Sequence, residues 1–453
     1  MGAYVIDSAL FRDQFGTSAM RAIFSDEQTV QKWLDVEAAL AKVQAELNII
    51  PAEAAAEIQK KAQVENIDLD ALKAEMDRTA HPIVPLLRAM KTACEGDAAE
   101  YIHWGATTQD IVDTGTILQM REAFEVLETS YLELIDNVRA LAERHKNTVM
   151  VGRTHGQQAL PITFGFKVAT WAAELQRNYA RLKKVRKEVL MGQFFGAVGT
   201  LASLPENGAL VQQRLNEELG LAEPVINWHT ARDGLAEMTS ALAIACATPA
   251  KIANEVFNLQ KTEVGELEEP FAEGKVGSST MPHKRNPPIC EGVLAINRAV
   301  RATVPLALEG MVTDFERDKV ALQVEREYIS RLFNMVHSAV LKMCFVTKKL
   351  HVRADNMERN LHAQGGLLMS EAVMMKLGKV LGRQEAHDIL YEICMKVFEQ
   401  GGNLKDALMA HPTIQSNFSR AEVEAMLDPH TYTGLSQYFV DKVLATKVDD
   451  ASL

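Results

Sequence analysis

The sequence predicts an all-α protein built from long helices. Two observations indicate this class: the placement of proline and the spacing of apolar residues. No proline occurs between Pro85 and Pro161 or between Pro305 and Pro412. A proline inside a helix costs about 3 kcal/mol, so gaps of this length are what long helices require. Helices much longer than the mean of about 11 residues are typical of bundles, and we expect a bundle here.

The first long helix is expected to begin at Ser25. Gln28 follows three residues later, and this spacing is the pattern of a capping box. Apolar residues then recur at helical spacing until Asn48 and Pro51 end the run. We interpret the apolar stripe of this helix as core packing.

Longer helices follow in the proline gaps. From Gln109 to Lys146 the apolar residues recur with a period near 3.6, interrupted only by Gly115. Similar runs cover residues 164–191, 233–268 and 288–352, and we expect the last of them to be broken more than once. Strand signals are scarce, since only residues 148–151 and their surroundings look extended before a turn.

The helices group into three expected domains. An N-terminal helical domain covers residues 1–105, a central long-helix bundle covers 106–350, and a C-terminal helical domain covers 351–453. Several central helices are apolar around most of their circumference, as in residues 233–258. Such helices are buried on most faces, which predicts that the central bundle forms the core of an oligomer.

Composition excludes several classes of function. The net charge is −12 and no long basic run occurs, which disfavours nucleic-acid binding. The five cysteines are scattered without a C-x-x-C pair, which argues against a disulfide framework or a zinc site. The N-terminus lacks a basic region followed by an apolar one, and no uninterrupted apolar stretch approaches the roughly 20 residues of a membrane span. We therefore expect a cytoplasmic protein without membrane partners.

Four segments concentrate hydroxyls, amides, imidazoles and glycines between the helical runs: residues 79–82, 103–110, 152–158 and 277–287. All but the first lead directly into expected helices, whose free N–H groups bind carboxylates well. Taken singly, 107–110 is more often a helix cap, and His81 or His155 a hydrogen-bonded loop histidine. Taken together, the four segments predict a composite active site.

The segment 277–287, with the sequence GSSTMPHKRNP, closely resembles the signature loop of the fumarase/aspartase superfamily. Members of that superfamily eliminate a group from the carbon β to a carboxylate. Residues 103–110, 152–156 and 260–266 also follow the superfamily's order and approximate spacing, so the resemblance covers nearly the whole chain. It implies an elongated homotetramer around a central bundle, with each active site built from three subunits. It also implies a small dicarboxylate or tricarboxylate substrate, no metal and no organic cofactor.

The resemblance also assigns roles to individual residues. Ser278 is similar to the base that removes the proton, and Lys284 stabilises its alkoxide. The resulting aci-carboxylate is expected to be held by Lys284, Asn286, Thr107, Thr108 and Gln109. His155 resembles the general acid, with His81 as a possible partner. Further expected contacts to substrate anions come from His103, Arg317 and Arg326, and Lys261 and Glu263 are expected to order the site.

Within the superfamily the chain resembles the branch of adenylosuccinate lyase and 3-carboxy-cis,cis-muconate cycloisomerase. The phosphate-binding run of the former, Ser-Ser-Ala-Glu-Arg, is here 322–326, which keeps only Glu and Arg. Residues 228–233 are similar to the cycloisomerase, but His155 replaces the Trp of bacterial cycloisomerases. The first expectation is therefore a C–N lyase that cleaves an N-substituted aspartate and releases fumarate. The alternatives are the cycloisomerase, then adenylosuccinate lyase, and a catalytically silent scaffold.

Overall fold

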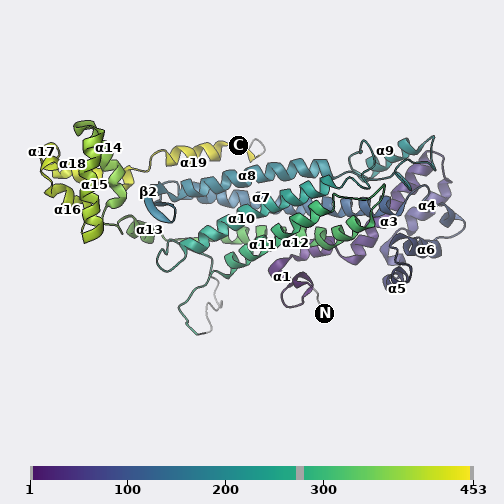
Figure 1. Cartoon of the computed structure of the whole chain (residues 1–453). Helices are drawn as coiled ribbons and strands as arrows, with labels where there is room; N and C mark the ends of the chain where they lie inside the picture. Colours follow the sequence, from purple (N-terminus) through teal and green to yellow (C-terminus); the bar gives the residue numbers. More distant parts are fainter. Residues whose placement is uncertain (1–3, 272–279, 449–453) are drawn as a thin grey trace. The chain divides into compact units, whose positions relative to one another are not determined.

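The computed structural model describes residues 4–271 and 280–448, so Ser278 lies outside the described residues. The described chain forms 19 α-helices, five short 3-10 helices and four strands (Figure 1). This confirms the all-α class. Contacts divide the chain into two units, and the three expected domains stay a prediction. The first unit is Met1–Leu132, Asn178–Pro249 and Gly292–Leu341, and the second is Glu133–Arg177, Ala250–Glu291 and Lys342–Leu453.

Five long helices contribute residues to both units: α7 (Thr108–Arg144), α8 (Phe164–Val189), α10 (Asp233–Leu259), α11 (Pro288–Glu309) and α12 (Lys319–Lys348). The expected run over 288–352 is broken once, between α11 and α12, rather than more than once. Two prolines lie inside these helices, Pro249 in α10 and Pro305 in α11. The expected runs included both prolines, and the run over 233–268 was too long, since α10 ends at Leu259.

The remaining helices of the first unit are α1 (Arg12–Phe15), α2 (Ser18–Ile23), α3 (Asp26–Glu46), α4 (Ala52–Lys61), α5 (Leu69–Thr79), α6 (Ile83–Ala93) and α9 (Gly208–Leu219). Ser25 caps α3 as expected, because its hydroxyl accepts the N–H of Gln28 at 3.3 Å. Three 3-10 helices, Val5–Asp7, Val64–Asn66 and Ala98–Tyr101, complete this part. Side chains of α3, α4, α6 and the start of α7 share one apolar core: Trp33, Leu34, Val36, Ile58, Ile83, Leu86, Ile111 and Leu118.

Packing against α3 explains why a glycine, Gly115, lies inside α7. A Cβ atom at this position would lie 2.7 Å from Cδ1 of Trp33 on α3. Real Cβ atoms do not approach so closely, and the Trp33 ring is buried, so it cannot move away easily. The single break in the apolar period of this helix therefore marks a close approach of α7 to Trp33 of α3.

The second unit contains a hairpin of β1 (Val149–Thr154) and β2 (Gln157–Thr163), paired antiparallel. The extended signal at 148–151 predicted β1, and β2 was missed. Another short pair joins β3 (Leu267–Glu268) to β4 (His351–Val352). The C-terminal helices are α13 (Ala354–Leu361), α14 (Ser370–Leu381), α15 (Arg383–Gln400), α16 (Leu404–Ala410), α17 (Pro412–Asn417), α18 (Arg420–Met426) and α19 (Ser436–Ala445), with 3-10 turns at Leu367–Met369 and Pro429–Thr431. Of these, α14 to α18 form a cluster in Figure 1.

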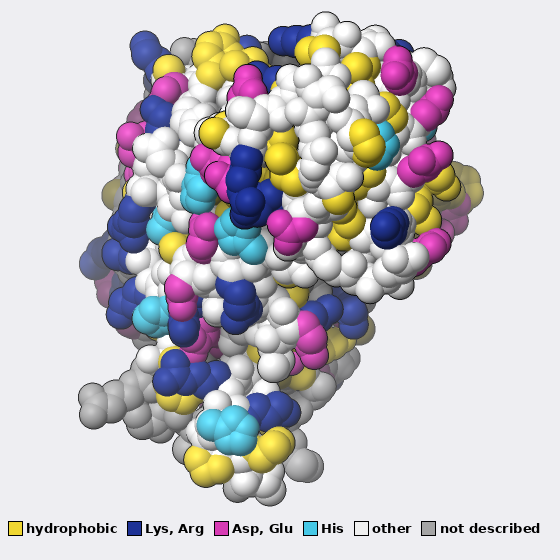
Figure 2. All heavy atoms as spheres, turned by 90° about the vertical axis from the view of Figure 1, so that its left-hand side faces the viewer, with side chains coloured by type: hydrophobic (Ala, Val, Ile, Leu, Met, Phe, Trp, Pro, Cys, Tyr) yellow, Lys and Arg dark blue, Asp and Glu magenta, His cyan; other side chains and the backbone are white. Residues whose placement is uncertain are grey.

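The charge of the surface and the hydropathy of the long helices are relevant to binding of nucleic acids and membranes. Lys and Arg side chains are interspersed with Asp and Glu on the face shown in Figure 2, in keeping with the moderate net charge. Among the described helices, one, α12, is long and apolar enough to cross a membrane by length and composition. In its most apolar window 72% of the residues are buried inside the structure, as in the core helix of a folded bundle.

Candidate active site

Asp110, in the first turn of α7, fixes three segments of the first unit. Its buried carboxylate accepts the backbone N–H groups of Thr107 at 3.0 Å, Phe195 at 3.1 Å and Gly196 at 3.0 Å. It also bonds Nε2 of the buried His229 at 2.8 Å. A carboxylate at a helix N-terminus satisfies otherwise free N–H groups. Asp110 therefore holds the turn before α7 against two loops that are distant in sequence.

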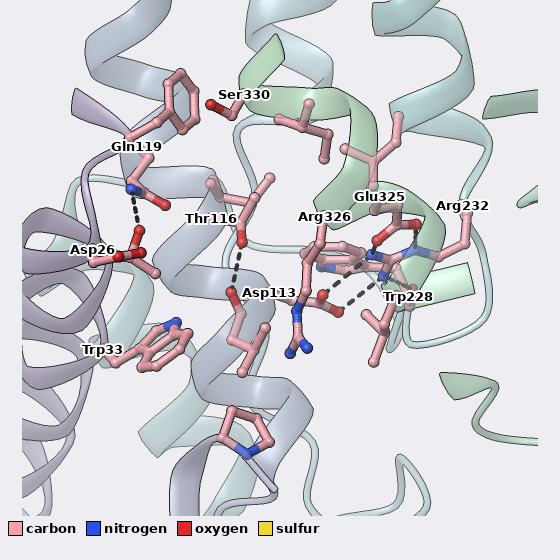
Figure 3. Close-up of a pocket in the computed structure, with 18 of the residues that line it drawn as sticks. Asp26, Trp33, Asp113, Thr116, Gln119, Trp228, Arg232, Glu325, Arg326 and Ser330 are labelled. Carbon is pink, nitrogen blue, oxygen red and sulfur yellow. Dashed lines mark hydrogen bonds and ion pairs between the residues drawn. The ribbon is translucent and has the colours of Figure 1, made fainter. Parts of the chain in front are cut away.

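One turn further along α7, Asp113 belongs to a buried ion cluster. Arg232 donates to both oxygens of Asp113, at 2.9 and 3.1 Å, and from Nε to Glu325 of α12 at 2.7 Å (Figure 3). Its guanidinium also stacks on the ring of Trp228, 4.9 Å from the ring centre. Burial lowers the pKa of Arg232, but the two carboxylates outweigh burial and raise it above its ordinary value. Burial raises the pKa of Glu325.

Gln109 helps to hold this ion cluster in place. Its side-chain nitrogen donates to Asp113 at 3.1 Å and to the carbonyl of His229 at 2.8 Å, and the residue is buried. Both amide protons of Gln109 are therefore used inside the protein. The sequence predicted a donor to the substrate at this position, whereas the structure places the side-chain amide in the framework beneath Thr107 and Thr108.

His81 and Thr108 are brought together. Nδ1 of His81 accepts the N–H of Val84 at 3.1 Å, so the proton of the neutral ring is on Nε2, which lies 3.2 Å from the hydroxyl of Thr108. Burial lowers the pKa of His81, helped by the charges of Lys319 and His103. The neutral imidazole donates to Thr108, which leaves the Thr108 hydroxyl proton free to bind an anion.

Two further expected anion binders differ in their partners. Arg317 donates to the backbone carbonyl of Ala197 at 2.6 Å, so it fixes a loop. Arg326 is exposed, has no hydrogen bond or ion pair within residues 4–271 and 280–448, and lines a cavity of about 330 Å³ (Figure 3). The cavity has a mixed lining, in which the carboxylates of Asp26, Asp113 and Glu325 lie among apolar side chains: Phe24, Trp33, Met76, Pro82, Val112, Ile117, Trp228, Leu235, Leu322 and Ile329. Burial lowers the pKa of Arg326, which nevertheless stays cationic.

In the second unit, His155 lies at the exposed tip of the β1–β2 hairpin, with a left-handed φ of 52°. It makes no hydrogen bond to the described part of the chain. The hairpin itself is tightly held, because Arg153 forms two hydrogen bonds to the buried Glu266, at 2.7 and 2.9 Å. Asn360 of α13 donates to the same carboxylate at 2.8 Å. A rigid support therefore presents an unengaged imidazole.

Both flanks of the signature loop are fixed. The side chain of Gln260 accepts the N–H of Glu269 at 2.9 Å and donates to the carbonyl of Arg285 at 3.2 Å. The buried carboxylate of Glu269 accepts the N–H groups of Ile289 at 3.2 Å and Cys290 at 3.1 Å, and so caps α11. Between these anchors, Lys284 is exposed and Asn286 is half-buried. Lys261 and Glu263 are also exposed, in the turn after α10.

Comparison with known proteins identifies the family to which this chain belongs. Residues 12–302 match the family model described as "Lyase", and residues 366–443 match "Adenylosuccinate lyase C-terminus". The chain belongs to the fumarase/aspartase superfamily of lyases. It is 42% identical to the N-acetyl-S-(2-succino)cysteine lyase of Enterococcus italicus over 98% of each chain. It is 41% identical to the adenylosuccinate lyase of Methanocaldococcus jannaschii, covering 96% of this chain and 94% of that one.

A solved structure of the 3-carboxy-cis,cis-muconate lactonizing enzyme from Pseudomonas putida superposes with a TM-score of 0.91 at 33% identity. The match covers 97% of this lyase and 98% of the other chain. The relatives thus include both branches that the sequence resembles. Because these relatives act on different compounds by name, membership of the superfamily does not fix the substrate of this lyase.

Sequence reasoning missed several charged residues that hold the site of this lyase. Asp113 was not singled out, and Arg232 and Glu325 were noted only as parts of the segments 228–233 and 322–326. Glu37, which binds His103, was also missed. A signal for Glu37 existed, because it shares one face of α3 with the buried Trp33 and Leu40, where a charged residue is unexpected.

Arg232→Met tests the ion cluster. The change leaves Asp113 and Glu325 buried without a counter-charge, and breaking a buried ion pair in this way typically costs about 3–5 kcal/mol. We expect the midpoint of thermal unfolding to fall strongly at pH 8. Because burial raises the pKa of Glu325, protonation at lower pH removes the uncompensated charge, so the variant regains part of its stability toward pH 5.

The control is Lys73→Met, which breaks an exposed ion pair with Asp77. Exposed pairs contribute about 0–1 kcal/mol, so its midpoint should stay near that of the wild type at both pH values. A midpoint of Arg232→Met equal to that of the control would contradict a structural role for the cluster.

Proposed function

We propose that this lyase eliminates a leaving group from a 2-succinylated compound and releases fumarate. The elimination removes a proton from the carbon next to one carboxylate and breaks the bond to the leaving atom on the neighbouring carbon. The donors expected from the sequence suit this step, since Thr107, Thr108, Lys284 and Asn286 can stabilise negative charge on the first carboxylate. Membership of the superfamily supports the reaction class.

We infer that the leaving atom is sulfur. The N-acetyl-S-(2-succino)cysteine lyase that matches over 98% of both chains carries in its name a succinyl group joined to a cysteine sulfur. A nitrogen-linked substrate, which the sequence first suggested, is the second candidate. The adenylosuccinate lyase at 41% identity favours that candidate, whereas the loss of the phosphate-binding serines at 322 and 323 disfavours a nucleotide.

The observation that carries the proposal is the unpaired guanidinium of Arg326. Arg232, its neighbour in the same region, is bound by two carboxylates, whereas Arg326 forms no hydrogen bond or ion pair within the described residues and feels the charges of Asp113 and Glu325 only at longer range. A guanidinium without a hydrogen-bonded partner, at a cavity lined partly by apolar side chains, is suited to a carboxylate that carries a small apolar group. The leaving group N-acetylcysteine has this chemistry, with one carboxylate and one acetyl group.

We propose that Ser278 is the base and His155 the acid, and that the active sites are shared within a homotetramer. The exposed position of His155 without a partner supports a role toward another copy of the chain. Apolar side chains exposed on long helices, Ile244 on α10 and Leu341 and Phe345 on α12, support association through those helices. The hairpin would then complete a neighbouring subunit's site.

Arg326→Gln tests the leaving-group pocket. Wild type is expected to release fumarate from N-acetyl-S-(2-succino)cysteine, measured by absorbance in the fumarate band. The variant should lose roughly 30- to 150-fold in kcat/KM, because a hydrogen bond to a charged group contributes about 2–3 kcal/mol. With S-(2-succino)-N-acetylcysteamine, which lacks the carboxylate on the leaving group, both proteins should react at similar rates.

N-succinyl amino acids and 3-carboxy-cis,cis-muconate serve as competing substrates in the same assay, and Ser278→Ala is the expected inactive control. Turnover of carboxymuconate alone would contradict elimination from a succinyl compound. An equal loss on both sulfur-linked substrates would show that Arg326 does not read the leaving-group carboxylate.

His155→Gln tests the acid. A thiol, with a pKa near 8.5, leaves as a thiolate far more readily than an amine leaves unprotonated. For a nitrogen-linked substrate we expect kcat to fall by about 10²–10⁴, the usual contribution of a general acid, and for its sulfur-linked counterpart by less than about tenfold. The same fall for both leaving atoms would instead indicate that His155 binds the substrate.

A further inference from the structure

The imidazole of His103 is held by a buried carboxylate. Nδ1 of His103 lies 2.6 Å from Oε1 of Glu37, whose side chain is fully buried in α3. The other oxygen, Oε2 of Glu37, is buried and has no hydrogen-bond partner. A carboxylate buried with one oxygen unsatisfied is costly, so stability alone does not account for this residue.

The main chain around His103 is fixed by the same helix. His103 has a left-handed φ of 63°, which is uncommon for a residue other than glycine. Gln44, two turns after Glu37 in α3, donates to the carbonyl of Trp104 at 2.7 Å. The carbonyl of His103 accepts the N–H of Ala106 at 3.2 Å in the turn that leads to Thr107. Helix α3 therefore sets both the ring and the backbone of this residue.

The groups that face His103 favour a cation. Burial lowers the pKa of His103, but the charges of Glu37 and Asp110 outweigh burial, so the net shift is upward. From the other side His103 acts on His81, whose pKa it lowers, and Lys319 adds to that effect. Nε2 of His103 is not buried and has no partner among the described residues. The ring thus presents one open N–H beside the pair of His81 and Thr108.

We propose that Glu37 is a positioning residue for the elimination: by binding Nδ1, it directs Nε2–H of His103 outward as a fixed cationic donor to a substrate carboxylate at the Thr107–Thr108 turn. A buried carboxylate that orients an imidazole and stabilises its cation is a recurring device in enzymes. The inference rests on the proposed function, because the ligand it requires is a dicarboxylate.

Calorimetric binding of fumarate to the full-length protein tests this role without any assumption about the leaving group. Fumarate stays a dianion between pH 5.5 and 8.5, so changes in its affinity report on the protein. In the wild type the affinity should fall as the pH rises through the pKa of His103. In Glu37→Gln the fall should occur at lower pH, so the Kd at pH 7 rises by up to about tenfold for each unit by which the pKa drops. Near pH 5.5 the two proteins should agree within about twofold, because both imidazoles are then charged.

Three further variants separate positioning from a structural role. Glu37→Asp keeps the charge and should retain a pH-dependent fall close to that of the wild type. His103→Gln should bind fumarate weakly and lose the fall in affinity with rising pH that belongs to His103. Any pH dependence that remains comes from the other histidines. The double variant Glu37→Gln with His103→Gln should match His103→Gln, since Glu37 acts through His103.

Two results would overturn the inference alone. One is a Glu37→Gln variant with wild-type Kd at every pH. The other is a loss of affinity that is equal at every pH and accompanied by a lower unfolding midpoint, as a merely structural residue would give. Failure of the wild type to bind fumarate at any pH would remove the proposed function, and this inference with it.

Discussion

The arrangement of the first unit depends on one buried cation. Arg232 joins Asp113 of α7 to Glu325 of α12, and it stacks on Trp228 in the segment before α10. Removing these charges from water is expensive, so the cluster is stable only because its geometry is complete. Gln193 adds a hydrogen bond to Asp113 at 2.6 Å. The start of α7 is thereby held in one position. Thr107 and Thr108 lie one turn away, so the same cluster fixes their positions too.

Much of the fold could be predicted because helical periodicity and proline are local signals. Ser25, the long run of α7 and the break between α11 and α12 were all expected from sequence. The strand β2 was missed because it contains Pro161 and begins with polar residues, which are poor strand signals, and only its pairing with β1 makes it extended. Pro249 lies inside α10 although a proline disrupts an isolated helix, since packing of the surrounding turns outweighs the local cost.

The candidate site also contains some residues that the sequence predicts and others that it does not. Exposed or loop residues such as His81, His155 and Lys284 belong to short polar segments that stand out between apolar helices. The residues that hold these side chains in place do not stand out in the sequence. Their partners are far away in sequence, and their helices look like ordinary core helices. Glu37 and His103 are 66 residues apart. No pattern within one segment indicates such a pair, although a carboxylate on an apolar helix face indicates that a buried partner exists.

The first turns of α12 contribute both to the ion cluster and to the cavity. Glu325 binds Arg232 and also lines the cavity, together with Leu322 and Arg326 of the same helix. Of these three residues, only Glu325 belongs to the ion cluster. Because Leu322 and Arg326 are not part of the ion cluster, we expect a change at either position to alter the cavity while the cluster still fixes the start of α7. Under the proposed function, the leaving group can then differ between relatives without a change in the groups proposed for proton removal and charge stabilisation.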